Sequence, residues 1–375
     1  MKSVLCTALA TLLSSGVVAS CGSSSIPEGE NTDAIGRDAG DGGQAGSGGA
    51  GGAPVMTMDG ASNVSCATNG TLSWRARSRL PHARFEVGAA VVKGRIYAIG
   101  GSDAATTTAE LDEYDPGTDT WTPKRPMPTA RQNAVVGVVG DKIYVTAGYA
   151  YTDPNNVTYF KATEVYDPAT DAWVTKAPIP APDASKVLAN LYLGGAALGD
   201  KIYVVVSVYS TNSNTLVYDT VNDSWSTAAP IPLLPSKPAA ATMGDLLYVV
   251  PLQIPGVGYE TRIATFDPAA PGWMVHPGPP TQREAPTAGV WAGALFVTGG
   301  WAWTFGTSNP AIPVNVVEAF DPPSSSWRAL SNLPTARALA ATASTGEGLY
   351  VIGGATGRAS TPLPSDVVEE ATCLP

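Results

Sequence analysis

Charged side chains are scarce in this sequence, and histidine is scarcer still. Asp, Glu, Lys and Arg make up 14% of the 375 residues, and the two histidines are His82 and His276. Metal centres and hydrolytic triads need His, Cys or carboxylate side chains in clusters, whereas these two histidines lie far apart and outside any ligand motif. We therefore expect neither a metal site nor a histidine-dependent hydrolase.

Basic clusters and nucleotide-binding loops are also missing. The formal net charge is −10, and no run of Lys or Arg occurs anywhere. The sequence therefore predicts no basic surface that would bind a nucleic-acid backbone or anionic lipid head groups. No Gly-rich phosphate loop opens a helix, and neither a G-x-S-x-G nor an H-E-x-x-H motif is found. We expect no nucleic-acid partner and no cofactor.

Helical periodicity is absent, whereas turn-forming residues are abundant. The chain holds 40 Gly and 32 Pro, and no long stretch carries an apolar stripe with helical spacing. This composition is typical of many short strands joined by turns, and one all-β domain can exceed about 200 residues. The sequence predicts an all-β body.

The first 20 residues have the pattern of an export signal. Lys2 precedes an apolar run over residues 4–18, which is too short to span a membrane. The end of the run, Val18-Ala19-Ser20-Cys21, resembles the lipobox of bacterial lipoproteins. The resemblance implies a lipid on Cys21 and an anchor in the bacterial cell envelope, at the outer membrane or cell surface, facing the periplasm or the exterior. The alternative is a plain secretory signal, with Cys21 incidental.

Residues 21–65 predict a flexible tether. They are rich in Gly, Ala and Ser, and residues 41–53 (DGGQAGSGGAGGA) have almost no side chains to bury. A Gly-rich coil spans roughly 5 to 6 Å times the square root of its length, so a few tens of Å would separate the anchor from the body. The lipid anchor is then the only expected contact with a membrane.

The body is built from a repeat. An aromatic residue followed by Asp, with Trp seven residues after the aromatic, recurs at Tyr114 and Trp121, Tyr166 and Trp173, Tyr218 and Trp225, Phe266 and Trp273, and Phe320 and Trp327. Ahead of each aromatic lies a hairpin pattern with turns such as Gly140-Asp141-Lys142. Self-similarity at a fixed period is the mark of a repeat architecture. Each unit predicts four strands.

The repeat resembles the kelch motif over residues 70–375. Three of the second strands end in a Gly pair, Gly100-Gly101, Gly299-Gly300 and Gly353-Gly354. The pair is replaced by Ala147-Gly148, Val206-Ser207 and Val250-Pro251 in the other three units. The resemblance implies a six-bladed β-propeller with four-stranded blades.

The two chain ends complete one blade between them. Trp74 is in register with the other five tryptophans but has no blade before it, and the last unit stops without a Trp. We predict that a strand around residues 72–75 supplies the outer strand of the last blade and closes the ring. The propeller domain then covers residues 66–375.

A disulfide between Cys66 and Cys373 is predicted at this closure. Cys66 lies just ahead of the first strand, and Cys373 lies two residues after Ala371, which replaces the repeat's aromatic. Cys6 leaves with the signal and Cys21 takes the lipid, so two thiols remain in an oxidising compartment. The alternative is two buried, unpaired cysteines.

Residues that recur in every blade are expected to be structural. The aromatic and Trp positions meet the same inter-blade environment each time, and burying a large ring there stabilises the fold. Four arginines at the start of blades are expected to pair with turn carbonyls or with the repeat's Asp; they are Arg84, Arg131, Arg283 and Arg337.

Recognition is expected where the blades differ, in the long connections from second to third strands. Aromatic and charged side chains of these loops are the candidates for ligand binding: Tyr149, Tyr151, Tyr259, Arg262, Trp301, Trp303, Phe305 and Arg358. At least one of Trp301 and Trp303 is expected to be exposed. The alternative is that the long loop of blade five packs its own aromatics.

The predicted function is a monomeric binding or recognition module for a glycan or protein partner at the cell envelope. The alternative is a sugar-acting enzyme that resembles the N-acetylneuraminate mutarotases among kelch-like propellers. Its acid and base groups would come from Glu86, Glu260, Glu284 and Arg358. Kelch-like galactose oxidases hold copper through two His and two Tyr, and His82 and His276 lack that context.

Overall fold

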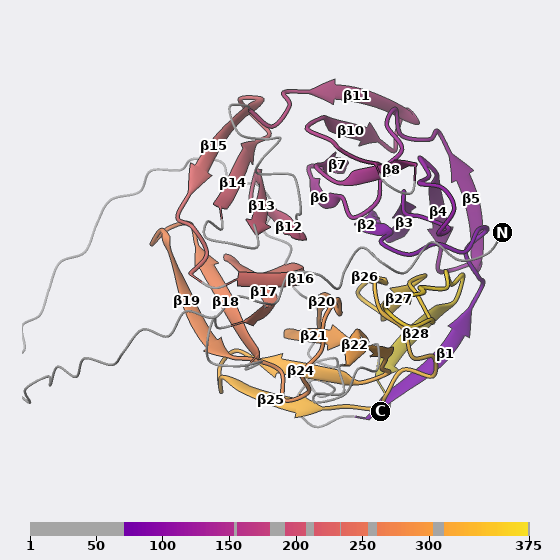
Figure 1. Cartoon of the computed structure of the whole chain (residues 1–375), viewed down its shortest axis with the longest axis vertical. Helices are drawn as coiled ribbons and strands as arrows, with labels where there is room; N and C mark the ends of the chain where they lie inside the picture. Colours follow the sequence, from indigo (N-terminus) through magenta and orange to yellow (C-terminus); the bar gives the residue numbers. More distant parts are fainter. Residues whose placement is uncertain are drawn as a thin grey trace, which may run out of the picture. The chain divides into compact units, whose positions relative to one another are not determined.

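The computed structural model describes residues 71–153, 156–180, 192–207, 214–232, 234–253, 261–302 and 311–373. These residues form six four-stranded antiparallel sheets arranged as blades around a ring (Figure 1). Within the described ranges there is no helix, and so none that could cross a membrane. The predicted all-β, six-bladed propeller is confirmed. The export signal, Cys21, the tether and Cys66 lie outside the described residues.

Blades 1 to 3 follow one another along the chain. Each has its first strand nearest the ring axis and its fourth at the rim. From the axis outward, the strands are β2 (Gly88–Val92), β3 (Arg95–Ile99), β4 (Leu111–Asp115) and β5 (Thr120–Lys124) in blade 1; β6 (Val135–Val139), β7 (Lys142–Thr146), β10 (Thr163–Asp167) and β11 (Ala172–Lys176) in blade 2; and β12 (Tyr192–Leu198), β13 (Lys201–Ser207), β14 (Asn214–Asp219) and β15 (Ser224–Ala228) in blade 3.

Blades 4 to 6 continue the ring. Their strands in the same order are β16 (Leu234–Met243), β17 (Leu246–Gln253), β18 (Thr261–Asp267) and β19 (Gly272–Pro277) in blade 4; β20 (Thr287–Trp291), β21 (Ala294–Thr298), β24 (Val317–Asp321) and β25 (Ser326–Ala329) in blade 5; and β26 (Ala341–Ser344), β27 (Leu349–Ile352), β28 (Val368–Cys373) and β1 (Leu72–Arg77) in blade 6. Two further hairpins lie within connections between second and third strands. They are β8 (Tyr149–Asp153) with β9 (Asn156–Tyr159) in blade 2, and β22 (Trp301–Ala302) with β23 (Ile312–Pro313) in blade 5.

The ring closes through the pairing of β1 with β28. Trp74 lies opposite Ala371 in this pair, the register in which Tyr114 lies opposite Trp121 in blade 1. The prediction that the first strand completes the last blade is therefore confirmed. Cys373 lies opposite Leu72, the first residue of β1. Cys66 precedes Leu72 by six residues in the sequence.

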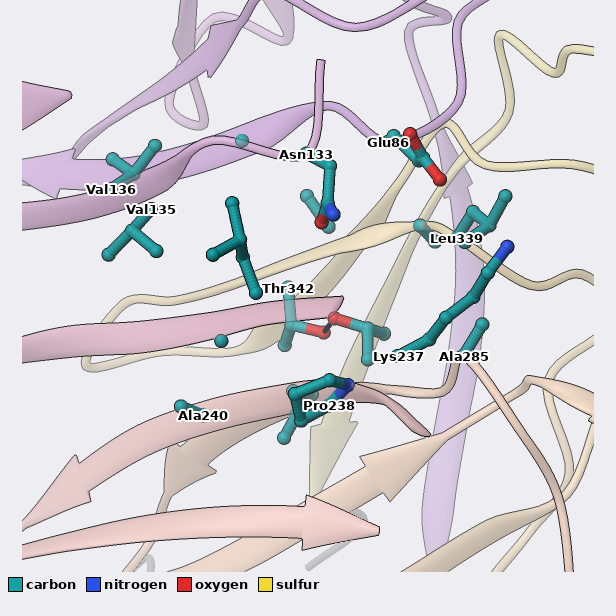
Figure 2. A pocket seen from close by; sticks show the side chains of 18 of the residues that line it. Glu86, Asn133, Val135, Val136, Lys237, Pro238, Ala240, Ala285, Leu339 and Thr342 are labelled. Carbon is teal, nitrogen blue, oxygen red and sulfur yellow. Dashed lines mark hydrogen bonds between the residues drawn. The ribbon is translucent and has the colours of Figure 1, made fainter. Parts of the chain in front are cut away.

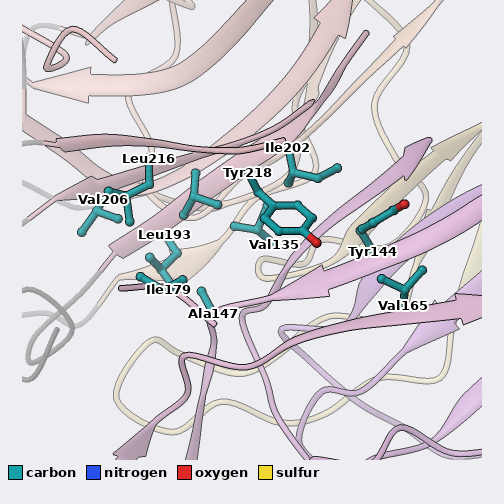
Figure 3. Packing of buried hydrophobic residues seen from close by; sticks show 11 residues of the cluster. Val135, Tyr144, Ala147, Val165, Ile179, Leu193, Ile202, Val206, Leu216 and Tyr218 are labelled. Atoms are coloured by element: carbon teal, nitrogen blue, oxygen red, sulfur yellow. The ribbon is translucent and has the colours of Figure 1, made fainter. Parts of the chain in front are cut away.

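Hydrophobic packing between neighbouring blades forms the core. Between blades 2 and 3, Val135 and Tyr144 pack in one buried cluster with Ile202 and Tyr218 (Figure 3). The second and third strands supply the most deeply buried side chains, because each lies between two other strands of its sheet. Each such aliphatic or aromatic side chain contributes about 1.5–3 kcal/mol on burial.

The repeated aromatics fasten each blade to the one before it. In blade 2, the Trp173 indole donates to the Arg125 carbonyl at 2.8 Å, just beyond the last strand of blade 1. Asp171 accepts from the Arg125 N–H at 2.9 Å and from the Tyr166 hydroxyl at 2.8 Å. The same indole bond recurs in all six blades, from Trp74, Trp121, Trp225, Trp273 and Trp327 as well. The repeat register is therefore structural, as expected.

The partners of the four recurring arginines agree only in part with the prediction. Arg131 is fully buried, donates to the Ala147 and Ala162 carbonyls, and forms an ion pair with Glu164 at 2.9 Å. The carbonyl contacts were expected, but the carboxylate lies two residues before the aromatic and is not the Asp after it. That Asp caps the turn at the far end of the third strand, as Asp167 does for the Ala169 N–H. It is therefore at the opposite end of the strand from the arginine.

Equivalent ion pairs occur in the other three blades that carry this arginine. They are Arg84 with Asp112 and Glu110, Arg283 with Glu318, and Arg337 with Glu369. Blades 3 and 4 have Leu216 and Ala264 at the carboxylate position, and both side chains are buried. The motif has been replaced there by apolar packing.

Candidate functional site

The first strands of the blades enclose a central channel. A cavity of about 180 Å³ at one end is lined by residues from β2, β6, β12, β16, β20 and β26 (Figure 2). A second cavity of about 300 Å³ further along shares Ala89, Val136 and Ala240 with the first. Each lining strand is the edge of its sheet, so its unpaired N–H and C=O groups contribute to the channel wall.

A ring of left-handed residues forms the mouth of the channel. One residue from each of five blades has a positive φ. Four of them lie two positions before the first strand of their blade, namely Glu86 (51°), Asn133 (51°), Ala285 (50°) and Leu339 (54°), and Lys237 (46°) lies within β16, where its pairing with β17 shifts register between Pro235 and Ala239. Hydrogen bonds join successive members, from the Leu339 N–H to Ala285 O at 3.1 Å, from Glu86 N–H to Leu339 O at 2.9 Å, and from Asn133 N–H to Glu86 O at 3.0 Å. These bonds offset the strain of the left-handed backbone.

Two charged side chains stand at this mouth, and among the described residues they are the only charged ones that line the cavity. Glu86 comes from blade 1 and accepts a hydrogen bond from the Tyr149 hydroxyl at 2.7 Å. Lys237 comes from blade 4, and its ammonium lies over the Trp301 ring, 5.2 Å from the ring centroid. Figure 2 shows both charged groups at the end of the cavity away from Val136 and Ala240.

The phenol of Tyr149 is kept in its protonated, hydrogen-bond-donating form. Burial raises the pKa of Tyr149 far above its usual value, and the neighbouring Glu86 carboxylate raises it further. The carboxylate therefore faces a permanent donor.

Tyr149 and Trp301 occupy equivalent places in blades 2 and 5. Each follows the second glycine of its Gly-pair position and exchanges backbone hydrogen bonds with a residue just before the mouth, Gln132 and Glu284 respectively. A Cβ on Gly148 (φ 81°) would lie 2.8 Å from the Gln132 carbonyl. Only glycine fits this close approach of two backbones, which explains why this glycine remains where the first of the pair is Ala147.

The structure brings part of the predicted set to the mouth. Tyr151 is 51% exposed and packs edge-to-face on Tyr149, with ring centroids 5.6 Å apart. Trp301 is only 3% exposed, and its indole donates to the Gly357 carbonyl at 3.2 Å. Arg358 is the exposed neighbour of that glycine. Trp301 is therefore buried beneath the mouth, where its ring contacts the Lys237 ammonium.

The remaining candidates are placed differently or are not placed. Arg262 lies on β18, where it pairs with Leu252 and Pro277 across the sheet of blade 4. Tyr259, Trp303 and Phe305 lie outside the described residues, as does Glu260, so the exposure of Trp303 stays a prediction. Glu284 is half-buried beside Trp301.

Sequence reasoning missed Asn133 and Lys237. The repeat does contain a signal for Asn133, because Glu86 and Asn133 each lie two residues after a recurring arginine, Arg84 and Arg131. Lys237 has no such marker, since blade 4 lacks the arginine.

The two histidines are separated in space as well as in sequence. His82 is exposed and lies 3.0 Å from Glu110, whereas His276 on β19 exchanges a hydrogen bond with Thr265 at 2.9 Å. Within the described residues no group of three or more His, Cys, Asp or Glu side chains could hold a metal ion.

Comparisons with known proteins agree with the repeat. The Kelch motif profile matches residues 83–128, 130–180 and 283–334, which cover blades 1, 2 and 5. Similar curated proteins include Kelch-like protein terF of Aspergillus terreus, 32% identical over 68% of this chain and 56% of its own length. Kelch-like protein 23 of Homo sapiens is 25% identical over 70% of this chain and 44% of its own length. The chain thus spans about half the length of these relatives.

A solved structure shares the fold. The structure of YjhT superposes with a TM-score of 0.60 and 16% sequence identity, over 79% of this chain and 96% of its own. Together with the matched segments, this shows that the chain carries kelch repeats in a six-bladed propeller.

Proposed function

We propose that this kelch-repeat propeller is a binding module that takes a glycan or protein partner at the mouth of its central channel. The observation that carries the proposal is the mouth itself, where equivalent positions of five blades hold five different side chains. A purely structural position would repeat the same residue, as the tryptophans do. Variation on a fixed scaffold is typical of a recognition surface.

The setting is part of the same proposal. The signal and lipobox-like sequence before Cys21 support export and a lipid anchor, and the Gly-rich residues 21–65 support a tether that gives the propeller reach. The test is expression in a bacterial host with a labelled fatty acid. Label and membrane association should both be lost in Cys21→Ser, whereas retention of the label in that variant would refute the anchor.

The binding proposal is tested by screening the full chain against a glycan array and a displayed peptide library. A specific hit should be weakened at least 10-fold by Glu86→Gln or Lys237→Met at the mouth. Matched controls are Glu347→Gln and Lys93→Met, which alter exposed residues at the turns between first and second strands, at the opposite end of the first strands. A hit that the control pair weakens and the mouth pair does not would exclude the channel mouth.

A second candidate, action on a sugar anomer, is favoured by the bond between Glu86 and Tyr149. The Glu86 carboxylate, positioned by the Tyr149 phenol, could accept and return a proton at an anomeric centre. Exchange NMR with reducing sugars separates the two functions. Acceleration of anomer exchange that disappears in Glu86→Gln would replace the binding proposal with an enzyme.

A further inference from the structure

We infer that the group entering the channel mouth is dipolar, with a cation that meets Glu86 and an anion that meets Lys237. The inference rests on the proposed binding function and specifies the chemistry of its ligand. Its basis is the placement of two opposite charges, one from blade 1 and one from blade 4, at the lining of one small cavity.

Glu86 has unused capacity to bind a cation. Its carboxylate accepts one hydrogen bond, from Tyr149, whereas a carboxylate has about four acceptor sites. Within the described part of the chain it has no ionic partner. The rings of Tyr149 and Tyr151 lie on the same side of the mouth, and aromatic faces beside a carboxylate also attract an ammonium group.

Lys237 has unused capacity to bind an anion. The Trp301 face holds its ammonium in place, but a ring face does not accept three N–H bonds in the way that oxygen atoms do. The described residues supply no carboxylate to it. An anionic group of a ligand would complete its coordination.

The two charges do not neutralise each other within the protein. They belong to blades 1 and 4, which lie on opposite sides of the six-bladed ring (Figure 1), and no ion pair joins them among the described contacts. Between them, the mouth is lined by Ala285 and Leu339 on one side of the ring and by Asn133 on the other.

A ligand with one charge would leave the other protein charge covered and unpaired, which is costly. A ligand with both charges satisfies each side. The spacing between its two charges should also matter, because the backbone of Glu86 is held by hydrogen bonds to Leu339 and Asn133 and the Lys237 ammonium rests on the Trp301 ring.

Unmodified glycine peptides are the probes. We would titrate the full chain calorimetrically with glycine and its di-, tri- and tetrapeptides, whose charge separation grows by about 3.3–3.6 Å per residue. Affinity should pass through a maximum along this series. At the optimal length, N-acetylation or C-amidation should each weaken binding about 10- to 100-fold.

Pairing each blocked end with one variant identifies which side chain meets it. Glu86→Gln should weaken binding of the free peptide about 10- to 100-fold, yet leave the N-acetylated peptide almost unchanged, because the contact is already lost. Lys237→Met should behave in the same way towards the C-amidated peptide. Glu347→Gln and Lys93→Met should leave all affinities unchanged.

Two results overturn the inference. One is the absence of binding by every free peptide, and the other is equal weakening of free and blocked peptides by the mouth variants. If a glycan or protein found in the screen still binds through the mouth, the proposed function survives without the dipolar ligand. If the mouth variants affect no ligand at all, both proposals fall.

Discussion

Trp74 lies opposite Ala371 across the antiparallel pair of β1 and β28, although the two residues come from opposite ends of the described chain. In every other blade a Tyr or Phe stands where Ala371 stands, and its Trp follows seven residues later in the same chain segment. At the seam the large ring comes from one chain end and a methyl group from the other. Separation of β1 would therefore expose the edge of blade 6 and the packing surface under Trp74.

We predict first that a disulfide stabilises the pairing of β1 with β28. Replacing Cys373 by Ser in the full chain should lower the free energy of unfolding by about 2–5 kcal/mol, because the predicted link to Cys66 closes a loop that includes nearly the whole propeller. Denaturant unfolding with and without reductant measures the loss. A non-reduced peptide map in which both cysteines carry a thiol label would contradict the disulfide.

The second prediction concerns the buried carboxylate of Glu370 at the seam. It accepts hydrogen bonds from Arg75, Arg77 and Tyr350. Burial alone raises the pKa of Glu370, but these bonds outweigh burial and hold the pKa below its ordinary value. Glu370→Gln should lower the free energy of unfolding at neutral pH by about 1–3 kcal/mol.

The pH dependence of this loss has a definite sign. Because the folded state holds the Glu370 pKa below that of the unfolded chain, the stabilisation is complete above the unfolded value of about 4.3 and is lost as pH falls through the folded value. The stability gap between wild type and Glu370→Gln should therefore narrow in acid. A gap that stays constant down to unfolding would refute a charged Glu370 as its source, and Glu347→Gln provides the exposed control.

The third prediction concerns the buried pair of Arg283 and Glu318, whose side chains lie 2.5 Å apart. Glu318→Leu alone leaves a buried guanidinium without its carboxylate and should cost about 3–5 kcal/mol. The double variant with Arg283→Met should be less destabilised than this single variant, since blade 3 packs Leu216 at the same position. Urea unfolding of the single and double variants measures these free energies. The prediction is wrong if the losses of the two single variants add up to the loss of the double variant.

The fourth prediction separates binding from stability at the mouth. Tyr149→Phe removes the donor to Glu86 and should cost about 0.5–1.5 kcal/mol of folding stability, together with a change in affinity for any ligand of the mouth. Tyr166→Phe makes the same chemical change in the same blade, at the Asp171 contact beside the turn from β10 to β11. It should lower stability similarly and leave ligand affinity unchanged, which parallel titrations of the two variants would show.

The architecture of the propeller can be predicted from the spacing of its repeated residues. Each blade buries its aromatic and Trp residues against the preceding blade, so the same residue types are required at the same spacing, and their register reveals the blades. The position of Trp74 outside any complete blade likewise predicted its pairing with β28, because only that pairing leaves no edge open.

The side chains that the blades present at the channel depend on tertiary contacts that the repeat does not predict. Burial of Trp301 depends on Gly357 from blade 6 and Lys237 from blade 4, and the burial of Tyr149 depends on Glu86 from blade 1. Such contacts join residues far apart in the chain, and no local spacing encodes them. The side chain at a mouth position makes no repeated inter-blade contact, so the repeat places the position without fixing the residue that occupies it.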